Sequence, residues 1–177
     1  MNENEAFYVA VTAWGTWAAV GCAFFAVWWQ IRASKKLTCT QLLLQLSAQY
    51  ESTDMHRKRA KLANTLLSDP NSRQLDDTVL VFFETLGHLM RGGYLDTDLV
   101  ATAFSVDVCN YWLALQSYIK DIRKQLSDDT MFCEFERLHD RLSGDFAWKR
   151  AAPGSRVSSP TPPDVIAFLR WEALRGD

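Results

Sequence analysis

The first hydrophobic pattern in the chain is an uncharged run from residue 7 to residue 29. These 23 residues contain no charged side chain, and a polar and basic stretch follows them directly. About 20 apolar residues cross the roughly 30 Å hydrocarbon core of a bilayer as a helix, because a helix satisfies its own backbone hydrogen bonds. The run predicts a retained transmembrane helix at 7–29, with a short external tail at 1–6 and a basic juxtamembrane segment at 30–37.

Aromatic and basic side chains flank the predicted span as interfacial residues do. All 19 Lys and Arg residues lie after the span, whereas Glu3 and Glu5 precede it. Basic residues close to a span favour the cytoplasmic side, and aromatic rings favour the headgroup region. We therefore expect the N-terminus outside and the following domain in the cytoplasm. The predicted membrane-interface residues are Tyr8, Trp28, Trp29, Arg32, Lys35 and Lys36.

Small residues recur every four positions within the span, at Gly15, Ala19 and Ala23. A ridge with this spacing lets two membrane helices approach closely. It predicts a helix–helix contact, although an Ala-rich span also produces such a ridge by chance.

After the span, apolar residues recur at helical spacing. The pattern and its capping residues predict helices over 38–51, from 54 to about 67, from 76 to about 91, over 97–104, from 105 to beyond 122, and from 128 to 142. Ser52 or Thr53 is the expected cap of the second helix and Asp96 of the fourth, while Gly92 and Gly93 end the third. Short connections favour antiparallel neighbours. The expected fold is all-α: a single N-terminal transmembrane helix followed by an antiparallel bundle of about five helices at 38–150.

Prolines interrupt the helical pattern at 151–163, which predicts an extended linker. The last segment, 164–177, is apolar enough to predict a short amphipathic helix. Three arrangements stay open for it: docking on the bundle, contact with the membrane, or binding in a groove of a partner protein. Its candidate binding residues are Val165, Phe168, Leu169 and Trp171.

The charge balance and the cysteine spacing limit the kinds of partner and metal that the chain is expected to bind. The residues after the span carry 19 basic and 21 − 2 = 19 acidic side chains, a balance that argues against a nucleic-acid binder. The basic stretch at 32–36 suits anionic lipid, and the one at 57–61 is read as a solvated helix face with lipid or partner binding as the alternative. The cysteines show no metal-binding spacing and are expected to be free thiols: Cys22, Cys39, Cys109 and Cys133.

The only arrangement that suggests catalysis is a partial metal site. Glu136 and His139 have the E-x-x-H spacing that forms half of a di-iron site in helical bundles, and Glu84 and His88 could lie opposite. A complete site needs a second such pair and two further inward glutamates, which the sequence lacks. Nucleophile elbows, phosphate loops and dinucleotide fingerprints are also missing. We therefore expect no cofactor, no metal site and no enzymatic activity.

Eleven residues of the predicted bundle carry a resemblance to a known family: Tyr50, Arg59, Phe82, Phe83, Glu84, Gly87, Gly93, Leu95, Phe104, Tyr111 and Trp112. Through them, roughly residues 31–142 resemble domain of unknown function 4760, an uncharacterised bacterial family. The resemblance implies a membrane-tethered helical domain at the bacterial inner membrane, and it supplies no reaction, ligand or functional residue. The proline-rich tail lies outside it.

The leading functional hypothesis is a single-pass, membrane-anchored module with a non-enzymatic interaction or regulatory role. Its expected partners are membrane lipid and either a protein partner or a second copy of the chain, and not nucleic acid. The alternative is an oligomerising, membrane-acting stress or phage-defence effector, motivated by the small-residue ridge and by Trp14 and Trp17 within the span. A metal-dependent enzyme ranks third.

Overall fold

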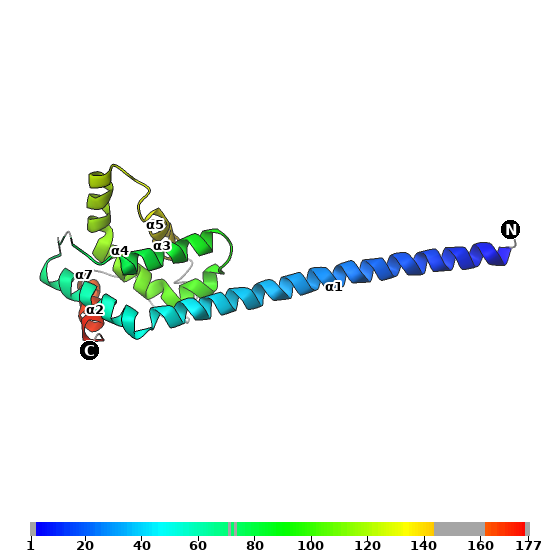
Figure 1. Ribbon diagram of the computed structural model, residues 1–177, viewed down its shortest axis with the longest axis horizontal. Helices are drawn as coiled ribbons and strands as arrows, with labels where there is room; N and C mark the ends of the chain where they lie inside the picture. Colours follow the sequence, from blue (N-terminus) through cyan, green and yellow to red (C-terminus); the bar gives the residue numbers. More distant parts are fainter. Residues whose placement is uncertain (1–2, 71, 73, 144–161, 176–177) are drawn as a thin grey trace. The chain divides into compact units, whose positions relative to one another are not determined.

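The computed structural model describes residues 3–70, 72, 74–143 and 162–175. Within these residues there is no strand, and the chain divides into two units, residues 1–41 and 42–177. The predicted all-α class is therefore confirmed. The helices are α1 (Glu3–Tyr50), α2 (Thr53–Ser68), α3 (Thr78–Arg91), α4 (Thr97–Leu126), α5 (Cys133–Ser143) and α7 (Pro162–Leu174) (Figure 1).

Helix α1 contains the predicted span, the juxtamembrane segment and most of the predicted helix at 38–51 in 48 uninterrupted residues. Among the residues that the structure describes, no helix is both long and apolar enough to cross a bilayer. The structure does not describe the side chains of 3–21, nor those of Ala23, Ile31, Ala33, Lys35 and Lys36. Tyr8 and the ridge of small residues therefore lie outside the described side chains.

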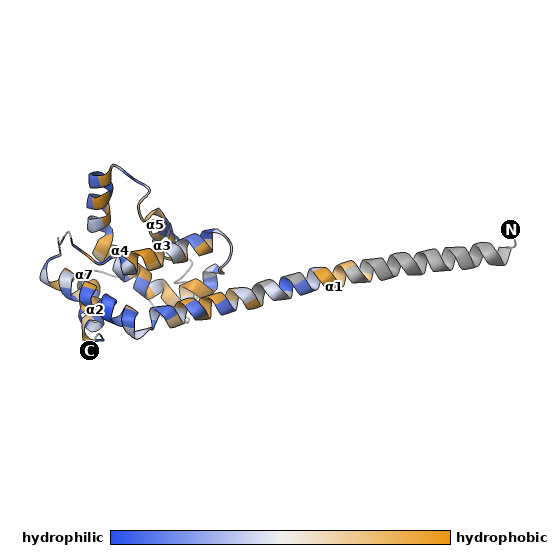
Figure 2. Ribbon diagram, viewed as in Figure 1, coloured by the Kyte–Doolittle hydropathy of each residue, from blue (hydrophilic) through white to orange (hydrophobic). Residues whose placement is uncertain are grey.

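The described part of α1 before Gln30 exposes large apolar side chains. In Figure 2 the ribbon of this part of α1 contains an orange stretch, which is followed by a blue one. The guanidinium carbon of Arg32 lies 4.4 Å from a ring centroid of Trp28, a cation–π contact at the step from apolar to basic sequence. The exposed side chains, between 49% and 73% accessible, are Phe24, Phe25, Val27, Trp28 and Trp29.

Local capping chemistry sets several helix ends as the sequence predicts. The Ser52 hydroxyl accepts a hydrogen bond of 3.3 Å from the Met55 backbone N–H, at the start of α2. Asp96 caps α4, because its side chain accepts hydrogen bonds from the backbone N–H groups of Asp98 and Leu99, at 2.9 and 3.3 Å. Gly93 follows α3 with φ of +72°, a left-handed conformation that glycine adopts without steric cost.

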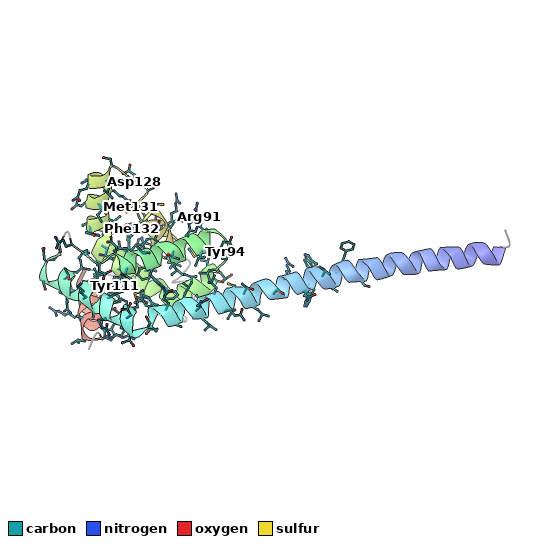
Figure 3. The ribbon with its side chains drawn as sticks, viewed as in Figure 1. Arg91, Tyr94, Tyr111, Asp128, Met131 and Phe132 are labelled. Carbon is teal, nitrogen blue, oxygen red and sulfur yellow. The ribbon has the colours of Figure 1, made fainter. Side chains whose placement is uncertain are left out.

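Two predicted helix boundaries are wrong. The segments predicted as 97–104 and as a second helix from 105 form one continuous helix, α4, because Asp107 points into the bundle and does not cap a new helix. Helix α5 begins at Cys133, not at 128. Ser127 and Phe132 have φ of 51° and 54°, so the backbone leaves the helical region on both sides of the connection that Figure 3 labels with Asp128, Met131 and Phe132.

An aromatic cluster forms the core of the bundle. Phe83 of α3 stacks on Phe135 of α5 with ring centroids 5.1 Å apart, and Tyr50 stacks on Phe82 at 5.0 Å. Edge-to-face contacts extend the cluster to α4, where Trp112 meets Phe135 at 5.3 Å. Such pairs add about 0.5–1.5 kcal/mol each beyond the area that they bury. The cluster therefore ties the end of α1 to α3, α4 and α5.

Helices α3 and α5 approach closely at Gly87. A Cβ atom at this position would lie 2.4 Å from the backbone oxygen of Glu134, so only glycine fits. One turn earlier, Glu84 accepts a hydrogen bond of 2.7 Å from the Phe135 backbone N–H and so caps α5 from a neighbouring helix. These two contacts fix how α5 lies on α3.

Helix α7 packs against α2 and α4 (Figure 1). Val165 and Leu169 are buried, and the ring of Phe168 meets that of Tyr111 edge to face, with centroids 5.1 Å apart. Trp171 is 50% exposed. Of the three arrangements that the sequence left open for this helix, the structure shows docking on the bundle.

Candidate functional site

A cation lies inside the bundle, between helices from distant parts of the chain. The side chain of Arg59, on α2, is 1% exposed, and its guanidinium carbon lies 4.0 Å from the ring centroid of Tyr50. A cation–π contact of this kind strengthens when water is excluded. It does not replace a counter-charge, because removing an ion from water costs several kcal/mol. The bundle therefore needs an anion at this point.

Glu172, on α7, is that anion, and its side chain is 0% exposed. Its Oε2 lies 3.3 Å from Nε of Arg59 and accepts a hydrogen bond of 2.9 Å from the Tyr111 hydroxyl, on α4. Its other oxygen, Oε1, has no hydrogen-bond partner among the described residues. One carboxylate of α7 therefore joins α2 and α4, and this ion pair exists only while α7 is docked. Figure 3 labels Tyr111 within the bundle.

A row of polar contacts connects the ion pair to the surface. Nη2 of Arg59 lies 2.6 Å from Nδ1 of His56, whose Nε2 lies 3.1 Å from Oε2 of Glu51. These distances fit the neutral tautomer with the proton on Nε2, because Nδ1 then accepts from the guanidinium. The same Glu51 oxygen lies 3.2 Å from Nη2 of Arg175, directly after α7. The C-terminal end of α7 is thus held at two points, by Glu172 inside and by Arg175 outside.

A second carboxyl group lies close to the ion pair, on α4. Burial, and after it the negative charge of Glu172, raises the pKa of Asp107 to about 6. Burial also raises the pKa values of Tyr50 and Tyr111 well above their usual range. Titratable groups with perturbed pKa values gather at catalytic sites, and also in structural ion-pair networks.

The accessibility of Arg59 and Glu172 distinguishes a catalytic site from a structural ion-pair network. Arg59 and Glu172 are almost completely enclosed, so a small substrate does not reach them while α7 is docked. The arrangement holds one carboxylate of α7, which lies next to apolar side chains, between a fixed cation and a hydroxyl donor. We therefore describe it as a candidate interaction site.

An apolar groove of about 550 Å³ lies beside α7 where this helix meets α2 and α4. Docked α7 therefore covers this face only in part, and larger apolar side chains would fit beside it. The groove also has polar residues, Gln116 and Arg170. Its apolar lining consists of Leu66, Leu67, Pro70, Leu113, Ala114, Val165, Ile166 and Leu169.

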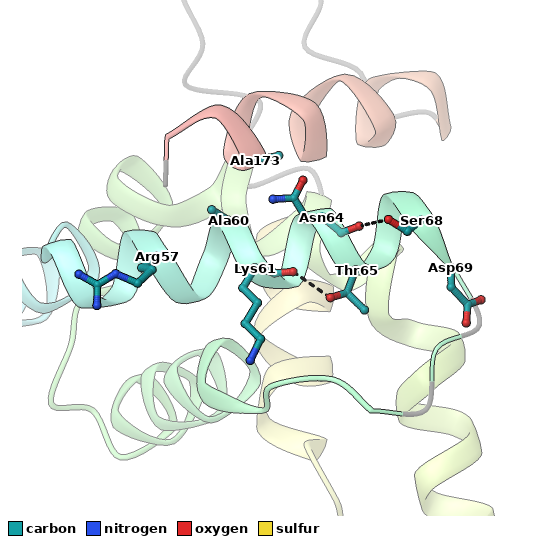
Figure 4. Close-up of a pocket in the computed structure, with 8 residues that line it drawn as sticks. All are labelled: Arg57, Ala60, Lys61, Asn64, Thr65, Ser68, Asp69 and Ala173. Carbon is teal, nitrogen blue, oxygen red and sulfur yellow. Dashed lines mark hydrogen bonds between the residues drawn. The ribbon is translucent and has the colours of Figure 1, made fainter. Parts of the chain in front are cut away.

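The basic stretch at 57–61 borders a different, polar pocket of about 550 Å³, which Figure 4 shows. Ala173 of α7 lies over Ala60 and Asn64 of α2, whereas Lys61 points away from α7. The hydroxyls of Thr65 and Ser68 donate to backbone oxygens of their own helix at 2.9 and 2.8 Å. The polar side chains do not converge on one point. The prediction of a solvated helix face at 57–61 holds for Arg57 and Lys61, which are exposed, and is wrong for Arg59, which is buried because it pairs with Glu172.

The residues considered for a metal site have other partners. Glu84 caps α5, and Glu136 forms an ion pair of 2.7 Å with Arg123. The ring of His139 stacks on Trp112 with centroids 5.4 Å apart, and His88 is exposed. Among the described residues, no three His, Cys, Asp or Glu side chains are grouped so that they would hold a metal ion. All four cysteines are free thiols.

Sequence reasoning found the apolar residues of the last helix and missed its buried acid. Val165, Phe168 and Leu169 contact the bundle as candidate binding residues would, but the buried acid Glu172 was not considered. A signal was present, because Glu172 follows Leu169 by three positions and Val165 by seven and so lies on the apolar face. An acid on the buried face of an amphipathic helix needs a buried cation.

A family model described as a domain of unknown function (DUF4760) matches residues 17–142. No curated protein and no solved structure matches the chain. The family match covers more than half of the 177 residues and confirms the resemblance seen in the sequence. It includes Arg59 and Tyr111 and ends before α7, which supplies Glu172.

Proposed function

We propose that this chain, which belongs to the DUF4760 family of domains of unknown function, is a membrane-anchored interaction module that binds a protein partner and catalyses no reaction. In this proposal α1 anchors the chain in the bacterial inner membrane, with the N-terminus outside. The helical bundle then works on the cytoplasmic side, close to anionic lipid.

The observation that carries the proposal is the division of the ion pair between two parts of the chain. Arg59 and Tyr111 lie within the family match, and Glu172 lies on a helix beyond it. The matched domain thus contains a buried cation whose counter-charge comes from a separate helix. A domain of this kind is suited to hold a helical segment, and holding such segments is the work of an interaction module.

The anchor is supported by the sequence of α1 and by its exposed side chains. The run at 7–29 is uncharged and helical. Its exposed large side chains include Phe24, Phe25, Trp28 and Trp29. Large exposed apolar patches mark contact with a membrane or a protein. The contact of Arg32 with Trp28 suits the headgroup region, where basic and aromatic side chains gather.

The experiment uses the full chain with a tag after residue 177, expressed in bacteria. We expect the protein to stay with membranes through an alkaline wash, and we expect the tag to be accessible from the cytoplasm only. Crosslinking in intact cells, followed by purification in detergent, should recover a reproducible protein partner. Release by the wash, an external tag, or the absence of both a partner and self-association would each contradict the proposal.

A matched pair of variants tests the anchor separately. Replacing Phe25 and Trp28 by Lys should release the protein, because each charge at the middle of a span costs about 2.5–3.5 kcal/mol and less near its end. Replacing Leu37 by Lys is the control, since this side chain is 66% exposed but lies after the apolar run. Equal retention of both variants would argue that α1 is not the anchor.

The small-residue ridge gives the test of the oligomerising effector. Leu at Gly15 and Ala19 should remove self-association, because the larger side chains prevent close approach of two helices. Crosslinking that is unchanged by these substitutions would exclude the ridge as an oligomer contact and leave the interaction module as the better account.

A further inference from the structure

The face of the bundle beneath α7 has the chemistry of a receptor for a helix. It offers a buried cation, Arg59, and a hydroxyl donor, Tyr111, at one end of α7. Toward the other end it offers an apolar surface that takes Val165 and Leu169. The helix that this face accepts therefore carries two aliphatic residues four apart and an acid three residues after the second.

Two observations show that α7 does not fill this face completely. The groove of about 550 Å³ beside it is lined mainly by apolar side chains of α2, α4 and α7. One carboxylate oxygen of Glu172 has no hydrogen-bond partner among the described residues. Well-packed interiors leave few spaces larger than a water molecule, so another helix with bulkier side chains would bury more apolar surface here.

Helix α7 belongs to the same chain as the face that it covers, with residues 144–161 between α5 and α7 in the sequence. It therefore binds this face as a tethered ligand, at an effective concentration that does not depend on the protein concentration. A competing helix must bind this face tightly enough to overcome that advantage. Docked α7 therefore raises the affinity that a competing partner needs and excludes weak ones.

We propose that this face is the binding site for an acidic amphipathic helix of a partner protein, and that α7 occupies it as an internal competitor. The proposal rests on the proposed function and specifies the partner by its chemistry: aliphatic side chains at the positions of Val165 and Leu169, and Glu or Asp at the position of Glu172. The positive charge of Arg59 selects for the acid, because an uncharged helix would leave this cation buried without a counter-charge.

The test uses the full chain in detergent with the substitution Glu172→Gln, which weakens the internal competitor and leaves the receptor residues intact. The probe is a labelled Ala/Lys host helix that carries Val, Leu and Glu at the spacing of 165, 169 and 172. We expect saturable binding, at least about tenfold tighter than to the wild-type chain, whose own α7 competes. A probe with Gln in place of Glu should bind at least about tenfold more weakly, as expected when a hydrogen-bonded charge is lost.

Two further variants, made in the Glu172→Gln chain, test which residues of this face distinguish the Glu probe from the Gln probe. Arg59→Met should abolish the difference between the Glu and Gln probes. Tyr111→Phe should reduce this difference while keeping the ring contact with Phe168, and it keeps the test decisive if the Arg59 variant does not fold. A folded Glu172→Gln chain that binds neither probe, or binds both equally, would overturn the proposal.

The same chains separate a partner protein from a second copy. Differently tagged wild-type chains should not exchange α7 to form a stable dimer. Dimers that disappear in the Glu172→Gln variant would overturn the assignment to a different protein. Because the peptide measurement needs neither a membrane nor an identified partner, its result is independent of the pull-down that tests the proposed function.

Discussion

Arg59 and Glu172 form an ion pair in which Nε of the arginine lies 3.3 Å from Oε2 of the glutamate, with both side chains enclosed. The pair joins α2, inside the region matched by the family, to α7, outside it. Tyr111 and His56 contact the pair directly, and Glu51 contacts it through His56. The pair therefore connects three helices of the bundle to the surface.

The ion pair should show strong coupling in a double-mutant cycle. Arg59→Met and Glu172→Leu should each lower the free energy of unfolding by about 3–5 kcal/mol, because each leaves one buried charge without its partner. The double variant should be more stable than either single one, since it leaves no unpaired charge. Urea unfolding of the three variants measures this, and additive losses would show that the pair is not coupled.

Asp107 should make the bundle less stable as the pH rises. Its pKa is raised from 3.8 to about 6 in the folded chain, so between these pH values the folded state holds more protons than the unfolded state, and stability falls with rising pH. Asp107→Asn should match the wild-type chain near pH 4 and exceed it by about 1–3 kcal/mol above pH 6. Thermal unfolding of both chains from pH 4 to 8 tests this.

The groups that face Asp107 determine whether its pKa is raised or lowered, and so whether stability falls or rises with pH. Burial and the charges of Glu172 and Glu51 raise its pKa, while Arg59 and the Tyr50 hydroxyl lower it. A difference between the two chains that is constant with pH would mean that Asp107 does not titrate in this range. A wild-type chain that gains stability relative to the variant as the pH rises would contradict the assignment.

The close approach at Gly87 should make this position intolerant of any side chain. Gly87→Ala should lower the free energy of unfolding by about 1–3 kcal/mol, because the added Cβ meets the rigid backbone oxygen of Glu134. Gly92→Ala is the matched control. Its Cβ would clash with the ring of Tyr94, which is exposed and can move, and would lie at an ordinary contact distance of 3.5 Å from the His88 backbone oxygen, so a change below about 1 kcal/mol is expected. Equal effects of both substitutions would show that α3 and α5 do not pack as described.

The cap that Glu84 provides should stabilise α5. Glu84→Ala leaves the Phe135 backbone N–H without its acceptor and should cost about 1–2 kcal/mol. Glu84→Gln keeps an acceptor oxygen and should cost less. Guanidinium unfolding of the two variants distinguishes the cap from a general effect of charge, which would make both substitutions equally costly.

Local chemistry was predictable from the sequence, and tertiary pairing was not. Ser52 and Asp96 cap their helices as predicted because a cap depends on residues within one turn. The predicted break before residue 105 does not exist, because Asp107 lies within α4 and close to Tyr50 and Arg59 of the folded bundle, where it does not start a helix. Sequence spacing contains no information about such neighbours.

The same limit explains the missed site residue. The sequence places Arg59 in a basic stretch that is predicted as solvated and gives Glu172 no role, because the two lie far apart in the chain and neither belongs to a recognisable motif. The apolar residues of α7 were predictable from their helical spacing. Their docking partner was not, since an apolar face of this kind suits the bundle, a membrane or another protein equally well.

Hydrogen exchange of the backbone amides of α7 in the full chain measures whether the ion pair holds this helix. We expect Glu172→Gln to increase exchange in 165–174 by about 10-fold or more, because α7 opens as a separate unit once its charge is lost, while exchange in α3 and α5 stays unchanged. If α7 keeps its protection in this variant, or if α3 and α5 lose protection together with it, then the ion pair does not hold α7 as a separable helix.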